Sequence, residues 1–272
     1  MNRQEIAVFH DRMRLKLTLA YDGRPFAGWQ SQRGPKPTVQ DTVEAAISAI
    51  AGPGPVRVHA SGRTDTGVHA LGQVAHFDAP ASARLGEADW HRALNAMLPP
   101  TVRVMRCAAV APDFHARFDA TGKTYRYRLW PAEVLAPLEV GLAWHLHGCL
   151  NEALLRQASR VFLGTHDFSS FSALRREPGE ENTSKVRTIR RLTVDPDGEA
   201  LVLTFEGDGF LYKMVRMIVG AIVQVARGRQ PLERLPELLA NPSPVKPGWQ
   251  APADGLYLVS VAYGTEAPAA GL

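Results

Sequence analysis

The sequence is most distinctive at residues 62–69, where it runs Gly62-Arg63-Thr64-Asp65-Thr66-Gly67-Val68-His69. A single carboxylate, Asp65, stands between two threonines and two glycines, with Arg63 two residues before it. Glycines let a backbone bend and approach a ligand closely, and a neighbouring arginine keeps a carboxylate ionised. An aspartate beside Thr and Gly also commonly caps a turn or a helix. Residues 61–67 are therefore predicted to form a loop whose Asp65 either takes part in chemistry or only caps a turn.

Strands and helices are predicted on both sides of this loop. Residues 14–21 alternate leucines with polar side chains, which is the period of a strand with one buried face. Thr38 followed by Asp41 predicts the start of a helix that runs to about residue 51. Further strands are predicted at 56–60, 73–77 and 102–110, and a helix at 87–97.

The second half of the chain repeats this mixture. Residues 123–130 alternate aromatic and basic side chains, which predicts a strand with Tyr125 and Tyr127 on one face. Asn151 is predicted to cap a helix to about residue 163, and the apolar run 211–226 is a predicted core helix, since a membrane span needs ~20 residues. Further strands are predicted at 188–194, 201–205 and 256–262.

This arrangement predicts the α+β class, with helices on one side of the sheets, because the strands and helices do not alternate strictly. Two halves of similar size are expected at 12–112 and 113–265, with tails at 1–11 and 266–272. The first half carries the Asp65 loop, and the two halves are expected to face each other across a cleft.

Basic residues are mostly arginine, 25 of the 31 Lys plus Arg in a chain of formal charge +4. They cluster at 117–128, 175–176, 185–191 and 227–229, and aromatic residues lie among or near them at Phe114, Phe118, Tyr125, Tyr127, Trp130, Phe168 and Phe171. Arginine and aromatic rings together favour binding of single-stranded or looped RNA. A GC-rich genome and a solvated charged face are the alternative explanations.

Several classes of protein lack support in the sequence. No apolar run approaches the ~20 residues of a membrane span, and the first ten residues show no secretory signal. The two cysteines, Cys107 and Cys149, form no pair motif, which favours a reducing, cytoplasmic location. Common phosphate-loop, dinucleotide and zinc motifs are absent, so no nucleotide cofactor and no metal are expected. A metal site at His145, His147 and Cys149 is an alternative, although this spacing fits no common zinc pattern.

Residues 62–69 resemble the signature loop of the tRNA pseudouridine synthase A family. Other segments resemble that family in the same order along about residues 14–263. They are Tyr21-Asp22-Gly23, Phe26-Ala27-Gly28-Trp29-Gln30, Thr38-Val39-Gln40, Gln73-Val74-Ala75-His76-Phe77, Asp113-Phe114-His115-Ala116-Arg117-Phe118, Lys123-Thr124-Tyr125-Arg126-Tyr127, Gly164-Thr165-His166-Asp167-Phe168, Val186-Arg187-Thr188-Ile189, Phe210-Leu211-Tyr212-Lys213-Met214-Val215-Arg216 and Gly255-Leu256-Tyr257-Leu258.

This resemblance implies a fold and an activity. The implied fold is the pseudouridine synthase fold, in which two similar α/β-sandwich-like halves with mainly antiparallel sheets face a central RNA-binding cleft. The implied activity is isomerisation of uridine to pseudouridine in the anticodon stem-loop of tRNA, at tRNA positions 38, 39 and 40. The family is dimeric, so a cytoplasmic homodimer that binds tRNA, without a cofactor and away from any membrane, is expected.

The resemblance also implies the roles of five residues. Asp65 matches the catalytic carboxylate, Tyr125 the ring that stacks on the target uracil, and Arg216 the basic partner of the catalytic aspartate. Leu256 matches an apolar wall of the base pocket, and Arg63 a residue that helps to hold the RNA or the flipped nucleotide.

By pattern alone, these residues also suit structural roles. Tyr125 and Leu256 suit the core, whereas Arg216 in an apolar helix requires an anion, for which Asp65 is a candidate. At the level of function, a non-catalytic RNA-binding module or tRNA chaperone, and a metal-dependent hydrolase built on the His145 group, are the competing hypotheses.

Overall fold

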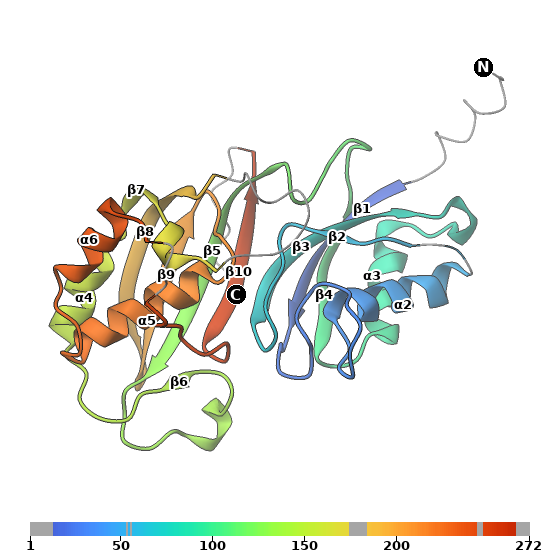
Figure 1. Cartoon of the computed structure of the whole chain (residues 1–272). Coiled ribbons are helices and arrows are strands. Elements are labelled where there is room, and N and C mark those ends of the chain that lie inside the picture. Colours follow the sequence, from blue (N-terminus) through green and yellow to red (C-terminus); the bar gives the residue numbers. More distant parts are fainter. Residues whose placement is uncertain (1–12, 53, 55, 174–183, 244–246, 265–272) are drawn as a thin grey trace. The chain divides into compact units, whose positions relative to one another are not determined.

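Strand β1 (Met13–Tyr21) confirms the alternation seen in the sequence, because Leu15, Leu17 and Leu19 are fully buried. The computed structural model describes residues 13–264 except 53, 55, 174–183 and 244–246 (Figure 1). Strand β1 lies between β3 (His69–Ala79) and β4 (Val102–Ala109) and is antiparallel to both. A short strand, β2 (His59–Ala60), pairs with β3 on the other side of the Asp65 loop.

Helices α2 (Val39–Ala51) and α3 (Glu87–Met97) accompany these strands and pack beside each other (Figure 1). The predicted cap of α2 is confirmed: the Thr38 hydroxyl accepts the Asp41 N–H and donates to the Asp41 carboxylate. Trp90 of α3 is fully buried, with its ring centroid 5.3 Å from that of Phe77 in β3. This contact holds α3 against the strands that support the loop.

A second set of strands follows the order β5-β9-β8-β7. These strands are β5 (Ala120–Trp130), β7 (Gly164–Asp167), β8 (Val186–Asp197) and β9 (Ala200–Gly207), and each neighbouring pair is antiparallel. The two-residue strand β6 (Trp144–His145) runs parallel to β5, and β10 (Leu256–Tyr263) is the last strand. The mixed α+β class predicted from the sequence is confirmed.

Three helices belong to this part: α4 (Glu152–Arg160), α5 (Met214–Ala226) and α6 (Arg234–Ala240). Short 3-10 turns occupy Ala81–Ala83, Pro137–Glu139 and Ser169–Phe171. Helix α5 is buried on nearly every turn and packs against α4, as the apolar run predicted. Within the described residues, no helix combines the length and the apolar character that crossing a membrane requires.

Several boundaries differ from the sequence prediction. Helix α5 begins at Met214 rather than at residue 211, because Lys213 has left-handed backbone angles (φ 60°, ψ 6°) that a right-handed helix excludes. Strand β2 covers only two of the five residues predicted at 56–60, and α4 ends at Arg160 rather than near 163. Strand β7 and helix α6 were not predicted, because they are short and lack a clear hydrophobic period.

The chain divides into two compact units. One runs up to Ala120 and takes in the chain from Ser260 onward, and the other spans Thr121–Val259. Residues 113–120, assigned to the second half from the sequence, belong to the first unit. Two hydrogen-bond partners, the buried His76 and the half-buried Tyr263, hold Ala116 of this segment in the first unit.

Candidate active site

The Asp65 loop (residues 61–68) connects β2 to β3 and is held by its own polar groups. The Ser61 N–H donates to the Val74 carbonyl at 2.8 Å, and the buried Gln73 amide donates to the Gly62 carbonyl at 2.9 Å. The Val68 N–H closes a turn onto the Asp65 carbonyl at 3.1 Å. These bonds fix the backbone that carries Asp65, while the side chains of Asp65 and Arg63 are only half-buried. The backbone of Asp65 is thus fixed within its unit, and Asp65 itself is not fully buried.

A glycine-rich segment packs directly on this loop. A Cβ on Gly23 would lie 2.1 Å from the Val68 carbonyl oxygen, and one on Gly28 would lie 2.7 Å from that of Thr64. Gly28 also has a positive φ of 92°, and the next N–H, from Trp29, donates to the Thr64 carbonyl at 3.0 Å. Only glycine permits this approach. The segments 21–23 and 26–30 had no assigned role in the sequence, and the structure shows that they support the Asp65 loop.

Tyr21 provides a second support for the loop. Its hydroxyl lies 2.9 Å from the Thr64 hydroxyl in a buried hydrogen bond. Burial raises the pKa of Tyr21 to about 12, so its hydroxyl stays protonated at neutral pH. Tyr21 is therefore a hydrogen-bonding support for the loop and not a proton acceptor.

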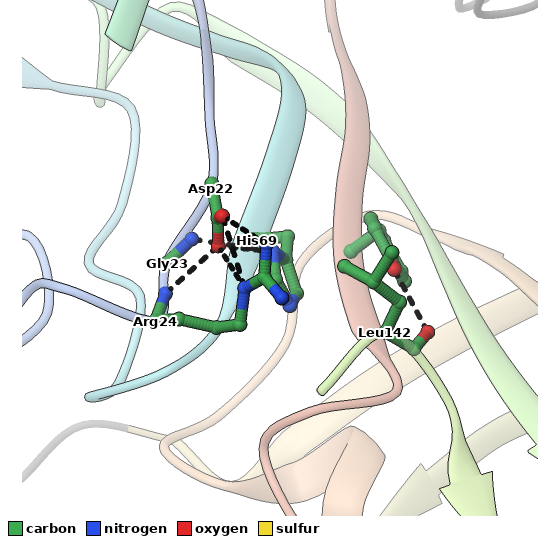
Figure 2. Close-up of polar contacts among 6 residues, drawn as sticks. Asp22, Gly23, Arg24, His69 and Leu142 are labelled. Atoms are coloured by element: carbon green, nitrogen blue, oxygen red, sulfur yellow. Dashed lines mark hydrogen bonds and ion pairs between the residues drawn. The ribbon is translucent and has the colours of Figure 1, made fainter. Parts of the chain in front are cut away.

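An ionic cluster adjoins the end of the loop (Figure 2). Asp22 accepts hydrogen bonds from the Arg24 side chain, at 2.6–3.0 Å, and from the Arg24 N–H. These bonds hold the pKa of Asp22 below its usual range. Asp22 Oδ1 also lies 3.4 Å from Nδ1 of the buried His69, which accepts the Gly23 N–H at 3.2 Å. Because Nδ1 is an acceptor there, the Asp22–His69 contact becomes an ion pair only when the imidazole is protonated.

Tyr125 lies on β5, opposite Phe205 of β9, and is half-buried. The rings of Tyr125 and Phe210 meet edge to face, with centroids 5.1 Å apart. Tyr127 shares its strand face but is fully buried, donates its hydroxyl to the Pro252 carbonyl at 2.9 Å, and has a pKa raised by burial. Of the two tyrosines, Tyr127 therefore belongs to the core, whereas Tyr125 is only half-buried.

The segment around residues 251–256 brings Arg216 and Leu256 toward β5. Arg216, in the first turn of α5, donates from Nε to the Ala251 carbonyl at 2.9 Å and accepts the Ala251 N–H on its own carbonyl at 3.0 Å. Leu256 is buried, and a Cβ on Gly255 would lie 2.6 Å from the Arg128 carbonyl of β5. Tyr125, Arg216 and Leu256 thus come from segments that are tied together in the second unit.

The five residues expected at the site divide between the two units. Asp65 and Arg63 belong to the first unit, and Tyr125, Arg216 and Leu256 belong to the second. The pairing of Asp65 with Arg216 stays a prediction.

Comparison with known proteins places the chain in a family. A family model described as tRNA pseudouridine synthase matches residues 18–119 and 158–264. The chain is 49% identical to tRNA pseudouridine synthase A of Akkermansia muciniphila, over 93% of this chain and 96% of that relative. It is 46% identical to the protein of the same name from Solidesulfovibrio magneticus, over 92% and 91%, and 42% identical to that of Bordetella petrii, over 93% and 92%.

The chain belongs to the tRNA pseudouridine synthase family. The resemblance noted in the sequence is confirmed, and the two matched segments include the Asp65 loop, the helix that carries Arg216 and the last strand. Residues 120–157 lie between the matched segments, and Tyr125 is among them. The assignment of Tyr125 to the candidate site therefore rests on its motif and on the geometry of β5.

The alternative metal site does not assemble. The rings of His145 and His147 are 4.1 Å apart, but strand β6 ends at His145, so Cys149 does not share a strand face with them. Nε2 of His145 lies 3.1 Å from the Ala132 carbonyl. Across the part of the chain that the structure describes, no three His, Cys, Asp or Glu residues are placed to hold a metal ion.

Some arginines of the basic clusters form ion pairs with carboxylates of the protein itself. Arg128 pairs with Glu139 and, at 3.4 Å, with Asp197, and Arg191 pairs with Glu206 at 3.2 Å. The basic cluster at 117–128 is therefore partly neutralised, which a one-dimensional count of charges cannot reveal. The pair Arg175 and Arg176 lies outside the described residues.

Proposed function

We propose that this protein isomerises uridine to pseudouridine in the anticodon stem-loop of tRNA, at tRNA positions 38, 39 and 40, with Asp65 as the catalytic carboxylate. The observation that carries the proposal is the Asp65 loop, in which a half-buried carboxylate stands on a backbone fixed by Gln73, Trp29 and two glycines. Membership of the tRNA pseudouridine synthase family supports it.

The reaction suits a single carboxylate. The N1–C1′ bond of uridine breaks, the uracil turns, and a C5–C1′ bond forms, so the product is an isomer and no redox equivalent or energy donor is consumed. Asp65 acts covalently, at C1′ or on the uracil ring, or removes the proton at C2′. No cofactor is proposed, because the atoms balance without one.

The other residues serve the detached base and the backbone. Tyr125 stacks on the flipped uracil, Leu256 lines its pocket, and both keep the base in place while it is detached. Arg216 pairs with Asp65, and Arg63 helps to hold the RNA. The incomplete burial of Tyr125 and the edge-to-face contact of its ring with Phe210 support the stacking role.

At the level of the whole protein, the proposal includes two α/β-sandwich-like halves that face an RNA-binding cleft. It also includes a cytoplasmic homodimer, in which one tRNA contacts both subunits. These features are what the resemblance noted in the sequence implies.

The test is whether the purified protein forms pseudouridine in unmodified tRNA transcripts in the presence of a chelator and without nucleotide. Modified positions are mapped after carbodiimide treatment, which marks pseudouridine. The expected result is product in the anticodon stem-loop and none in a transcript whose target uridines are replaced by cytidines. Tight tRNA binding without product would favour a binding module or chaperone instead.

A further inference from the structure

Residues 113–119 form a surface loop that is anchored in the first unit. The Ala116 N–H donates to Nδ1 of the buried His76 at 3.1 Å, and the Ala116 carbonyl accepts the Tyr263 hydroxyl at 2.7 Å. Arg14, itself paired with Asp78, donates to the Phe114 carbonyl at 3.0 Å. The loop therefore has a defined conformation set by side chains of β1, β3 and β10.

Four rings extend from the core to the surface through this loop. We call His59, His76, His115 and Phe118 the ring cluster. His59 and His76 face each other across β2 and β3, with ring centroids 5.2 Å apart. His115 lies 4.7 Å from His76, and Phe118 lies 4.3 Å from His115 at a tilt of 32°. The series ends in Phe118, which is 75% exposed. Only His115 lies between this exposed ring and the buried ring of His76 in the series.

The charges around the ring cluster are also defined. His115 accepts the Arg117 N–H on Nδ1 at 3.1 Å, so its ring, like that of His76, is a neutral imidazole with the proton on Nε2. Burial is the main cause that lowers the pKa of both rings. The Arg117 guanidinium lies 5.9 Å from the Phe118 ring centroid, and the Asp119 carboxylate accepts the backbone N–H of His115 at 2.8 Å. The outermost side chains thus combine the flat apolar ring of Phe118, the neutral imidazole of His115, the Arg117 guanidinium and the Asp119 carboxylate.

We infer that Phe118, with Arg117 and His115 beside it, is a second RNA contact: a platform on which an unpaired base of the tRNA substrate stacks. A nucleobase has a flat face that matches an exposed ring, and arginine beside such a ring binds the adjoining phosphate. The anchored loop holds the ring in place before binding, which lowers the entropy lost on association. This inference rests on the proposed function, because that function supplies the RNA.

The test compares tRNA affinities of the full-length protein and its variants by fluorescence anisotropy. Phe118→Ala is expected to weaken binding about 5- to 100-fold, the range typical of losing one base–ring stack. Phe118→Trp is expected to bind within about threefold of the parent, and Phe118→Leu as weakly as the alanine variant. Leu138→Ala, at a side chain 88% exposed in the second unit, is the matched control and should bind like the parent.

Salt dependence separates stacking from charge. Phe118→Ala should leave the slope of log Kd against log salt unchanged, because no phosphate contact is lost. Arg117→Ala should reduce that slope by about 1. Binding by Phe118→Ala within twofold of the parent would overturn the inference, as would equal losses in the leucine and tryptophan variants. A change in oligomeric state of Phe118→Ala by sedimentation would also overturn it and assign the ring to an interface between copies of this chain.

The failure of this inference is distinguishable from failure of the proposed function. If the parent forms no pseudouridine but its tRNA binding requires Phe118, the stacking platform is supported and the proposed isomerase activity is wrong. If the parent forms pseudouridine and Phe118→Ala binds tRNA as tightly as the parent, the isomerase activity is supported and the stacking platform is wrong.

Discussion

At the scale of single residues, Asp65 combines a fixed backbone with incomplete burial. Asp65→Asn keeps the shape and removes the nucleophile or base, so pseudouridine formation is expected to fall below detection while tRNA affinity is retained or slightly improved. The substitution should lower kcat rather than tRNA affinity, since the carboxylate acts at the reacting centre. Product from tRNA transcripts, Kd and thermal unfolding are measured on one preparation.

The control for this substitution is Asp89→Asn, which removes an exposed carboxylate paired with Arg92 on α3 of the same unit. It should retain full activity. Activity of a folded Asp65→Asn within tenfold of the parent would remove Asp65 from the chemistry.

Tyr125 and Tyr127 share a strand face but have different surroundings, which makes them a matched pair. Tyr125→Leu should lower activity because stacking needs a flat ring, whereas Tyr125→Phe should keep binding and lose turnover only if the hydroxyl moves a proton. Tyr127→Leu should instead cost roughly 1–3 kcal/mol of stability, since its ring is fully buried and bonded to Pro252. Steady-state kinetics and urea unfolding distinguish the two. Equal, mild effects of Phe and Leu at position 125 would assign Tyr125 to the core.

At the scale of elements, the contact between residues 23–28 and the Asp65 loop leaves no room for a side chain at Gly23. Gly23→Ala would place a Cβ 2.1 Å from the Val68 carbonyl, so the loop must shift. A displacement of about 1 Å at a reacting group lowers rates about 100-fold, and we expect that loss in turnover with a Kd for tRNA near that of the parent. Gly34→Ala is the control, because Gly34 is exposed and has open space around its Cβ position. Indistinguishable kinetics for Gly23→Ala and Gly34→Ala would mean that the Asp65 loop can shift without any effect on turnover.

The ring cluster connects β2, β3 and the 113–119 loop, and its buried member His76 makes stability depend on pH. Burial, with nearby His115, Arg14 and His59, lowers the pKa of His76 to about 4, whereas Asp78 opposes this shift. Since about 6.5 is the value expected in the unfolded chain, the unfolded state binds the proton first. The stabilisation is complete above about pH 6.5 and is lost as pH falls toward 4, by roughly 1–3 kcal/mol.

This pH dependence is measured by urea unfolding between pH 7 and pH 4.5. His76→Asn retains an acceptor for the Ala116 N–H but cannot be protonated, so its stability should fall less steeply with acidification. His147→Asn, at an exposed histidine of the second unit, should follow the parent curve. A parent-like slope in His76→Asn would mean that other groups cause the acid sensitivity.

At the scale of the whole molecule, only part of the positive charge is available to RNA. Binding of tRNA should weaken steeply with salt, by about 0.7–0.9 in log–log slope for each neutralised phosphate. Arg128→Ala should leave that slope unchanged and lower stability by roughly 1–3 kcal/mol, because its guanidinium pairs with Glu139 and Asp197. Anisotropy titrations at several salt concentrations, with thermal unfolding of the same variant, provide the check. A flatter slope for Arg128→Ala would show that its ion pairs open to receive phosphate.

The whole chain also shows where prediction from the sequence reaches its limit. The alternating leucines of β1 and the Thr38 cap are local patterns, and both elements formed where the sequence predicted them. Helix α5 began later than predicted because Lys213 adopts left-handed angles that no residue pattern signals. The alternative metal site at His145, His147 and Cys149 was wrong because strand β6 ends at His145. Only a strand that continued to Cys149 would have aligned the three side chains on one face.

By itself, the sequence determined the α+β class, most of its strands and helices, and, through motifs in order along nearly the whole chain, the family. Hydrophobic period, capping and motif order are properties of near neighbours in the chain, so they survive without a structure. Only the tertiary structure decided that Gly23, Gly28 and Tyr21 support the Asp65 loop, that Tyr127 rather than Tyr125 is core, and that Arg128 is already paired. Each of these depends on groups far apart in sequence whose distance, burial and charge are set when the chain packs, and no local pattern encodes them.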